Sequence, residues 1–340
     1  MMKILIVDDS ALIRSILKHL LNNKIEKNFI IAGEASDGER AVEMNRELKP
    51  DVIIMDINMP KMNGIEATRR IMKDNPVPIL IFSREIDADI SYKAMSAGAV
   101  DVMPKPTMDQ INEPNFYKKF LQKIQVLGTS EELPVPGSAV TNSKSVLKKN
   151  KYQMLVMGAS AGGPVAVKEV LENLPGTFPF GIALVQHMER GFDKGYVRWL
   201  NQATRLSVRL AGDTELIRPG EVFVAPVDKH LIVAGNRLML DDGPRILNQK
   251  PCADVLFESA ALSYGDRLVG VLLTGMGRDG ASGCVSVLSK GGITLVQDEQ
   301  TSAIFGMPKA AIEMGGASKI LPLQKIAEYL IWLARGNYRQ

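Results

Sequence analysis

The sequence predicts an α/β protein of two domains, each built on a mainly parallel sheet covered by helices. Short apolar runs rich in β-branched residues alternate with longer helical patterns along most of the chain. Residues 126–150 interrupt this alternation with a stretch dominated by Ser, Thr, Pro, Gly, Asn and Lys, a composition that cannot bury a core. The length of 340 residues also suits two domains of about 150 residues each. We therefore expect domains at 1–125 and 151–340, joined by a linker at 126–150.

The first domain is expected to hold one parallel sheet with helices on both faces, because strand and helix patterns alternate five times. The runs expected to form its strands are Ile4–Val7, Ile30–Ala32, Val52–Met55, Ile79–Phe82 and Val100–Met103. Helical patterns lie at Ser10–Leu21, Gly38–Leu48, Gly64–Met72 and Lys118–Val126. A sheet of this kind gathers the carboxyl ends of its strands along one edge, where ligands bind.

The second domain repeats this alternation and adds an antiparallel pair, which predicts a doubly wound α/β domain with a hairpin. Its strands are expected at Met154–Met157, Gly181–Val185, Val222–Ala225, Leu268–Thr274 and Ile293–Val296. Its helices are expected at Pro164–Asn173, Phe192–Gln202, Asp254–Ser263 and Gly280–Lys290. The hairpin is expected to pair Leu231–Ala234 with Leu238–Leu240 around the turn Gly235-Asn236.

Composition excludes several classes of protein. Two cysteines cannot frame a disulfide-stapled secreted fold, and with three histidines they form no zinc-ligand cluster. The N-terminus lacks the apolar stretch of a signal peptide, and no run reaches the length of a membrane span. With 41 Lys and Arg against 38 Asp and Glu, no strongly basic surface for nucleic acid is indicated. We expect a cytoplasmic protein that neither inserts into a membrane nor binds nucleic acid.

Acidic residues follow two strands of the first domain. Asp8 and Asp9 follow the first strand and Asp56 ends the third, so the parallel sheet would bring them together. Three carboxylates repel one another unless a cation is present, and such oxygen ligands suit Mg²⁺. Ser83 and Lys105 follow the fourth and fifth strands and would grip a phosphoryl group at the same edge. The alternative is that Asp8 and Asp9 only cap the next helix, but capping explains neither Asp56 nor Lys105.

A Gly-rich turn follows the first strand of the second domain. The pattern Gly158-x-Ser160-x-Gly162 matches a nucleophile elbow, but a strand, Gly-rich turn and helix can also bind a dinucleotide. A dinucleotide fold expects an acid at the end of the next strand to hold the ribose. This strand ends instead in Gln186 and His187, and histidine is the usual general base for an alcohol nucleophile. The residues thus favour Ser160 as a nucleophile activated by His187.

A third residue is needed to orient the imidazole. The strand ending near Thr274 leads into a Gly-rich turn that carries Asp279, and neighbouring strand ends would bring Ser160, His187 and Asp279 together. The order Ser, His, Asp differs from that of an ordinary α/β-hydrolase, so another fold is expected. Two alternatives stay open from spacing alone: Asp279 could be a helix cap, and His230 could be the base. Backbone N–H groups of the turn, and of the residue after Ser160, could form an oxyanion hole.

The first domain resembles the response-regulator receiver family over about residues 1–125, in the segments VDDS and MDINMPKMNGIE and the pair Lys105-Pro106. The resemblance implies a flavodoxin-like fold with a five-stranded parallel sheet, and Asp56 as the phosphoryl acceptor. It implies further residues that hold Mg²⁺ or contact the phosphate: Asp8, Asp9, Asp56 and the Asn58 carbonyl for the metal, and Ser83 and Lys105 for the phosphate. The family often has an aromatic residue three positions before the lysine, where this sequence has Val102.

The second domain resembles the catalytic domain of the chemotaxis protein-glutamate methylesterases, the CheB family, in the segments MGASAGG, VQHM, APVDKHL, ADVLFESAA, LLTGMGRDGA and QDEQTSAIFGMPKAAIE. The resemblance implies Ser160 as nucleophile, His187 as base and Asp279 as orienting acid, with an oxyanion hole at the Met276 backbone and no cofactor in this domain. This sequence departs from the family at three positions: Ala161, where Thr is common, Cys252, where Ser is common, and Glu189, where Pro is usual.

Together the two resemblances predict an enzyme that is controlled by phosphorylation. It would hydrolyse glutamate γ-methyl esters on methylated chemoreceptors and deamidate receptor glutamines, with a histidine kinase as the phosphoryl donor. The competing hypothesis is a signalling adaptor whose second domain binds receptors or a kinase without turnover. Binding alone does not require Ser160, His187 and Asp279 together, so the residues favour the enzyme.

Overall fold

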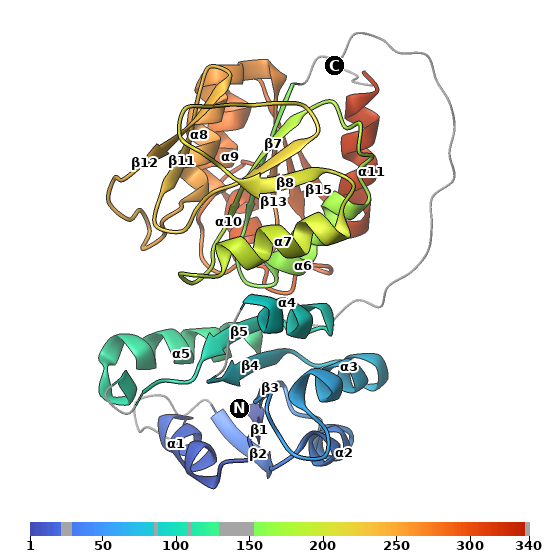
Figure 1. Ribbon diagram of the computed structural model, residues 1–340, viewed down its shortest axis with the longest axis vertical. Helices are drawn as coiled ribbons and strands as arrows, with labels where there is room; N and C mark the ends of the chain where they lie inside the picture. The colour runs from blue at the N-terminus through green and yellow to red at the C-terminus, as the bar shows by residue number, and fades with distance from the viewer. Residues whose placement is uncertain (22–28, 85–87, 108–109, 129–152, 337–340) are drawn as a thin grey trace. The chain divides into compact units, whose positions relative to one another are not determined.

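Figure 1 shows the computed structural model, which describes residues 1–21, 29–84, 88–107, 110–128 and 153–336. The chain divides into two compact units, residues 1–133 and 134–340. Most of the segment predicted as a linker, residues 129–150, lies outside the described residues. No helix in the described ranges is both long enough and apolar enough to cross a membrane.

The first unit is a five-stranded parallel sheet in the order β2-β1-β3-β4-β5, which confirms the predicted flavodoxin-like fold. Its strands are β1 (Met2–Val7), β2 (Phe29–Ala35), β3 (Val52–Met55), β4 (Ile79–Ser83) and β5 (Asp101–Pro104). Its helices are α1 (Ala11–Leu21), α2 (Gly38–Leu48), α3 (Gly64–Asp74), α4 (Ala88–Ser96) and α5 (Pro114–Leu127), with a 3₁₀ turn, η1, at Gln110–Asn112. Asp37 and Asn63 begin α2 and α3 by accepting hydrogen bonds from backbone N–H groups of the first turn.

The second unit has a seven-stranded parallel sheet in the order β15-β14-β13-β6-β7-β10-β8 and a small antiparallel sheet in the order β11-β12-β9. The strands are β6 (Met154–Ala159), β7 (Gly181–Gln186), β8 (Ser207–Leu210), β9 (Glu215–Leu216), β10 (Glu221–Val224), β11 (His230–Ala234), β12 (Arg237–Asp241), β13 (Leu268–Leu272), β14 (Ile293–Gln297) and β15 (Lys319–Leu321). The helices are α6 (Gly163–Glu172), α7 (Asp193–Ala203), α8 (Ala253–Tyr264), α9 (Ala281–Ser289), α10 (Met307–Glu313) and α11 (Leu323–Ala334), with a 3₁₀ turn, η2, at Gly265–Arg267. The doubly wound sheet and the hairpin, now β11 and β12, are both confirmed.

The order of the strands locates the functional edge of the second sheet. In the sheet, β7, β10 and β8 lie on one side of β6, and β13, β14 and β15 lie on the other. The direction therefore reverses at β6, and such a reversal opens a crevice at the carboxyl ends of the strands. Every residue of β6, β7 and β13 is buried, because helices cover both faces of the sheet (Figure 1).

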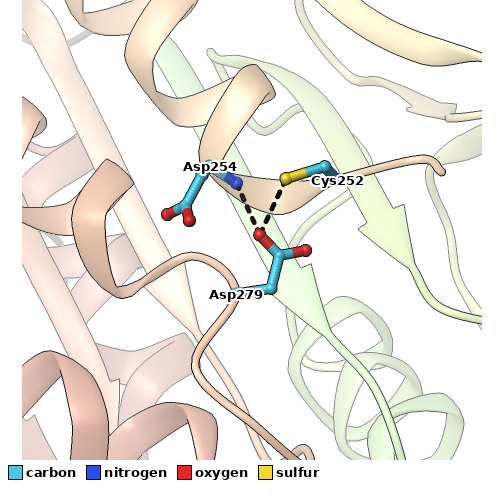
Figure 2. A group of neighbouring side chains, drawn as sticks. All are labelled: Cys252, Asp254 and Asp279. Carbon is cyan, nitrogen blue, oxygen red and sulfur yellow. Dashed lines mark hydrogen bonds between the residues drawn. The ribbon is translucent and has the colours of Figure 1, made fainter. Parts of the chain in front are cut away.

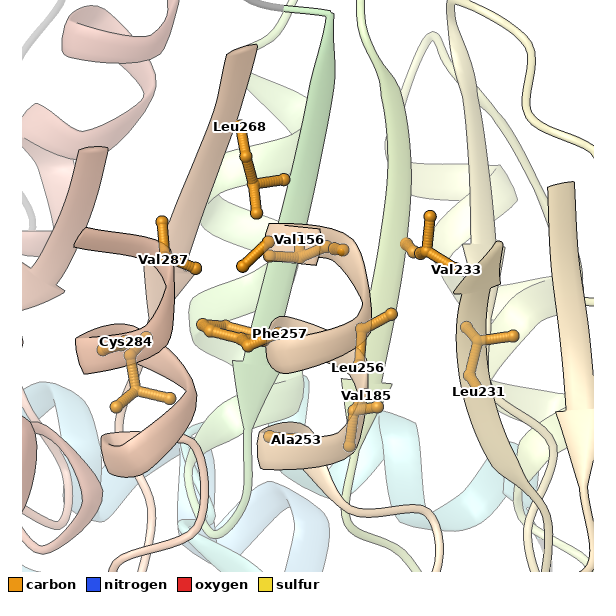
Figure 3. Packing of buried hydrophobic residues seen from close by; sticks show 14 of the residues in the cluster. Val156, Val185, Leu231, Val233, Ala253, Leu256, Phe257, Leu268, Cys284 and Val287 are labelled. Carbon is orange, nitrogen blue, oxygen red and sulfur yellow. The ribbon is translucent and has the colours of Figure 1, made fainter. Parts of the chain in front are cut away.

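Helix α8 packs between the seven-stranded sheet and the hairpin (Figure 3). Its Phe257 lies against Val156 of β6 on the sheet side, and Leu256 lies on the side of Val233. These four hydrophobic side chains are each at most 3% exposed. This packing fixes the N-terminal end of α8 close to the carboxyl ends of β6 and β7, where the candidate site lies.

Candidate functional site

The carboxyl ends of β6, β7 and β13 are joined by backbone hydrogen bonds. The His187 N–H donates to the Ala159 carbonyl at 3.0 Å, and the Ser160 N–H donates to the Thr274 carbonyl at 3.0 Å. Ser160 follows β6, His187 follows β7, and Thr274 begins the turn after β13. The three segments that the sequence indicated for the serine site thus meet at the point where the strand order reverses.

His187 and Asp279 form a buried pair at this edge. His187 Nε2 lies 2.7 Å from Asp279 Oδ2, and the two side chains are 7% and 3% exposed. Burial acts to raise the pKa of the Asp279 carboxyl. The hydrogen bonds from His187, Cys252 and the Ala253 N–H outweigh burial, so the pKa lies below its usual value. Asp279 is therefore an ionised acceptor that fixes the orientation of the imidazole.

The N-terminal end of α8 holds the Asp279 carboxylate (Figure 2). Asp279 Oδ2 accepts the Ala253 N–H at 2.7 Å, and Oδ1 accepts the Asp254 N–H and the Cys252 thiol, each at 3.0 Å. Burial raises the pKa of the Cys252 thiol, so that this side chain remains a protonated donor. Asp279 thus contacts both His187 and the first turn of α8, and does not cap α9, the helix that follows it in the chain.

The remaining ring nitrogen of His187 is free to act as a base. Nδ1 is buried, and in the described part of the chain it has no hydrogen-bond partner. Ser160 is half-buried, and a Cβ placed on Gly275 would lie only 2.8 Å from Ser160 Cβ, so glycine there leaves room for the serine. Among the described hydrogen bonds none joins Ser160 Oγ to His187, a separation common in catalytic sites without substrate.

His230, the alternative base, lies in a different setting. It begins β11, is buried, and its Nε2 lies 2.9 Å from the Pro244 carbonyl oxygen. His187, not His230, is the histidine placed against Asp279. The geometry therefore favours His187 over His230 as the residue able to act on Ser160.

Backbone hydrogen bonds join the Gly-rich turn after β13 to the segment that leads into α10. The Gly275 N–H donates to the Ile304 carbonyl at 3.0 Å, and the Gly306 and Met307 N–H groups donate to the Gly275 carbonyl at 3.1 and 2.8 Å. Within the described residues, no hydrogen bond uses the Met276 N–H. This N–H is therefore available to stabilise an oxyanion, as the sequence resemblance implied for Met276.

Gln186 is a buried residue of the site that sequence reasoning overlooked. Its side-chain amide donates to the carbonyl oxygens of Ser160 at 2.8 Å and of His187 at 3.0 Å, and so ties both residues together. A polar residue at the end of a fully apolar strand was the available signal. In the sequence, Gln186 shows directly only that a ribose-binding acid is absent from this strand end.

A cavity of about 200 Å³ adjoins His187. Three basic side chains line it, Arg190, Arg245 and Lys250, together with Asp228, which pairs with both arginines. The hydrogen bonds from Arg190 lower the pKa of Asp228, and burial raises it. The charges of the basic residues also lower it, so the net pKa lies below its usual value. The wall of the cavity beside His187 therefore carries an ionised carboxylate between cations.

The acidic edge of the first unit is assembled as its sequence suggested. Lys105 Nζ lies 2.6 Å from Asp8 Oδ2 and 2.7 Å from Asp56 Oδ2, and all three side chains are buried. Carboxylate oxygens of Asp8, Asp56 and the exposed Asp9 lie within 4.8 Å of one another. Burial raises the pKa of Asp8 despite Lys105, so a further cation would relieve this site. The donor set of carboxylate oxygens fits Mg²⁺.

The other residues named for this unit lie on β4, on β5 and in the loop after β3. Ser83 is the last residue of β4 and is buried, and its carbonyl accepts the Lys105 N–H at 3.0 Å. Asn58 lies in the exposed loop between β3 and α3. Val102 is a buried residue of β5.

Comparison with known proteins gives matches over both units. The family model for CheB methylesterase matches residues 155–330, and that for the response regulator receiver domain matches residues 4–113. A protein-glutamate methylesterase/protein-glutamine glutaminase of Pyrococcus horikoshii is 39% identical over 97% of this chain and 92% of its own. A protein of Anaeromyxobacter dehalogenans with the same name is 38% identical over 98% of this chain and 97% of its own. The crystal structure of the Thermotoga maritima CheB methylesterase catalytic domain covers 54% of this chain and 98% of its own, with 39% identity and a TM-score of 0.52.

Proposed function

This chain belongs to the CheB methylesterase family, with a receiver domain in front of the catalytic domain, and we propose that it is a phosphorylation-regulated protein-glutamate methylesterase. Its substrates would be glutamate γ-methyl esters on methylated chemoreceptors, and it would also deamidate receptor glutamines, as the names of its relatives indicate. The observation that carries the proposal is the buried His187–Asp279 pair beside Ser160 at the reversal of the strand order.

The first half of the reaction would form an acyl-enzyme. Ser160 Oγ attacks the ester carbonyl carbon while His187 Nδ1 takes the hydroxyl proton, because Nε2 is engaged with Asp279. The carbonyl oxygen becomes an oxyanion, for which the Met276 N–H is the available donor. The intermediate then breaks its bond to the methoxy oxygen, which receives the proton from His187 and leaves as methanol.

The second half would release the product carboxylate. A water molecule gives a proton to His187 Nδ1 and attacks the acyl carbon, and Ser160 Oγ then leaves and takes the proton back. A glutamine side chain would react through the same acyl-enzyme, with ammonia in place of methanol. Asp279 stays ionised throughout and stabilises the imidazolium that forms twice in the cycle.

Ser160→Ala tests the nucleophile, and a matched pair of histidine variants tests the base. Ser160→Ala and His187→Gln should abolish methanol release from methylated receptor, whereas His230→Gln should retain most of it. Full activity in folded Ser160→Ala, or a larger loss at His230 than at His187, would contradict the assignment. Receptor binding without methanol release from the unaltered chain would favour the signalling adaptor instead.

The first unit would accept a phosphoryl group on Asp56, from a histidine kinase in the cell. Mg²⁺, held by Asp8, Asp9, Asp56 and the Asn58 carbonyl, would neutralise the charge that gathers there, while Ser83 and Lys105 contact the phosphate. Acetyl phosphate should label the chain only when Mg²⁺ is present, and Asp56→Asn should remove the label. If the Asp56→Asn variant still carries a phosphoryl label, and that label is as stable to base as in the unaltered chain, the acceptor is another residue.

A further inference from the structure

A buried acid next to Asp279 takes no part in the proposed reaction. Asp254 lies in the first turn of α8 and is only 8% exposed, although its neighbours include the ionised Asp279. In Figure 2 its carboxylate is turned away from the Asp279 carboxylate, while its own backbone N–H donates to Asp279 Oδ1. A buried carboxylate is costly unless its oxygens accept hydrogen bonds, so its contacts indicate what it does.

An acid at or just before the start of each of the helices α8 and α9 accepts hydrogen bonds from the N-terminal end of the other helix. Asp279, which precedes α9, accepts the N–H groups of Ala253 and Asp254 at the start of α8. Asp254, at the start of α8, accepts the Gly283 N–H in the first turn of α9 at 2.7 Å. Each carboxylate thus satisfies unpaired amides at the N-terminal end of the other helix, where the helix dipole favours negative charge.

Neither helix has a cap of its own to replace this exchange. The residue before α8 is Cys252, whose side chain donates to Asp279 and makes no capping bond to the helix. The residue before α9 is Gly280, which has no side chain. Cys252, Asp254 and Asp279 already have hydrogen-bond partners within the protein, so their clustering requires no metal ion.

The two helices are too closely packed to move separately. A Cβ on Gly283 would lie 2.5 Å from Phe257 Cβ and 3.2 Å from Asp254 Cα, so glycine lets α9 approach α8 at this turn. Phe257 and Cys284 both belong to the buried hydrophobic cluster at these helices and are fully buried (Figure 3). A change in the bond from Asp254 to α9 would therefore displace the loop that precedes α9, and Asp279 is in that loop.

We infer that Asp254 is a positioning residue for the proposed triad, because its bond to α9 fixes the loop from which Asp279 orients His187. The inference rests on the proposed function. Asp254 touches neither Ser160 nor the cavity beside His187, so its effect would fall on kcat rather than on KM. The acceptor oxygen, rather than the negative charge, is the property that the position requires.

Two substitutions that keep the branched skeleton of aspartate separate these properties in the full chain, and leucine is the bulkier of the two. Asp254→Asn keeps an oxygen that can accept the Gly283 N–H, and should hold kcat for methanol release within about threefold of the unaltered chain. Asp254→Leu removes the acceptor, and should lower kcat about 10- to 100-fold with KM nearly unchanged, because small displacements of catalytic groups are costly. Ile326→Val changes a fully buried side chain of α11, a helix that contacts α6 and β14, and is the control for general loss of stability.

The outcomes distinguish this inference from the proposed function. Full kcat in folded Asp254→Leu, or an equal loss in Ile326→Val at a similar fall in Tm, would overturn the positioning role. If the leucine variant does not fold, Asp254→Asn still tests the claim that the position requires the acceptor oxygen and not the charge: a loss of tenfold or more in the folded variant would contradict that claim. Ser160→Ala is measured alongside, since activity that survives in it would refute the proposed function rather than the role of Asp254.

Discussion

Both oxygens of the Asp279 carboxylate accept hydrogen bonds, Oδ1 from Cys252 and the Asp254 N–H, and Oδ2 from His187 and the Ala253 N–H. An amide at this position has to turn its NH₂ group toward one of these pairs of donors. If it faces His187, it favours the tautomer with the proton on Nδ1, the nitrogen that should act as base. Asp279→Asn should therefore lower kcat by up to about 10⁴-fold, measured as methanol release at saturating substrate. A loss of less than about tenfold in a folded variant would argue against Asp279 as the orienting acid.

Asp254 should make the stability of the catalytic unit depend on pH. Burial, and then the charge of Asp279 and Glu258, raise the pKa of Asp254 from 3.8 to about 6, although the Gly283 N–H acts in the opposite direction. Protonated Asp254 thus favours the folded state, and this stabilisation is lost as the pH rises from about 3.8 through about 6. The Asp254→Asn variant should gain in free energy of unfolding relative to the unaltered chain over that window, by at most about 3 kcal/mol.

Calorimetry of both chains at pH 5 and pH 8 would measure this difference. Asp279→Asn should show the opposite pH dependence of stability. Because the pKa of Asp279 is lowered in the folded state, its ionised form stabilises the fold above the pKa of the unfolded chain, and this stabilisation is lost as the pH falls. A stability difference for Asp254→Asn that does not change with pH would show that Asp254 ionises normally.

At the scale of single residues, the sequence predicts which side chains follow neighbouring strands but not how those side chains are held. Ser160, His187 and Asp279 each follow a buried strand, and parallel strands end at a common edge, so their convergence could be predicted. The choice of Nε2 as the atom that faces Asp279 depends on ring orientation, which no spacing encodes. Asp254 resembles an ordinary acid in a first helical turn. Its burial depends on α9, a separate segment of the chain.

The packing of the segment before α10 against the turn after β13 gives a prediction at the scale of elements. A Cβ on Gly306 would lie 2.7 Å from the Gly275 carbonyl oxygen and 3.0 Å from the Gly277 nitrogen. Gly306→Ala should therefore displace the turn that presents the Met276 N–H, and lower kcat about 10- to 1000-fold with little change in KM.

Gly212→Ala is the matched control, because its Cβ would meet only the flexible carboxylate end of Glu215, at 3.3 Å. Methanol release from the two folded variants gives the comparison. Equal activity in both would mean that the position of this turn does not limit the reaction.

At the scale of elements, the buried strands were predicted well, whereas the helices α4, α10 and α11 and several short edge strands were not expected from the sequence. Every residue of β6, β7 and β13 is buried, so the continuous apolar runs were a strong signal. Strand β9 has two residues, and β15 is largely exposed, so neither shows an apolar pattern. Their pairing comes from neighbouring strands that are distant in sequence. The strand expected to run to Thr274 ends at Leu272, and the Thr274 N–H donates to the Gln297 side chain rather than to the backbone of a neighbouring strand.

At the scale of the whole molecule, a change at Asp56 matters to Ser160 only if the two units are energetically coupled. Their tether keeps each at an effective concentration in the millimolar range for the other, so even a weak restraint by the unphosphorylated receiver would be largely in force. Phosphorylation would need to shift that equilibrium by only about 1–3 kcal/mol to raise activity from several-fold to about a hundredfold.

Removal of the receiver tests this coupling. A polypeptide of residues 151–340 should release methanol from methylated receptor faster than the unphosphorylated full chain, and should not respond to acetyl phosphate. That such a catalytic domain can be stable alone is supported by the solved catalytic domain of Thermotoga maritima CheB, 98% of which matches this chain. Asp56→Asn in the full chain should remain at the low basal rate. Methylated receptor is the appropriate substrate, because a small ester could reach Ser160 even when a bulky protein could not. If the folded polypeptide is no faster than the resting full chain, restraint by the receiver is wrong. Phosphorylation would then have to activate the catalytic unit directly or bring the enzyme to its receptor.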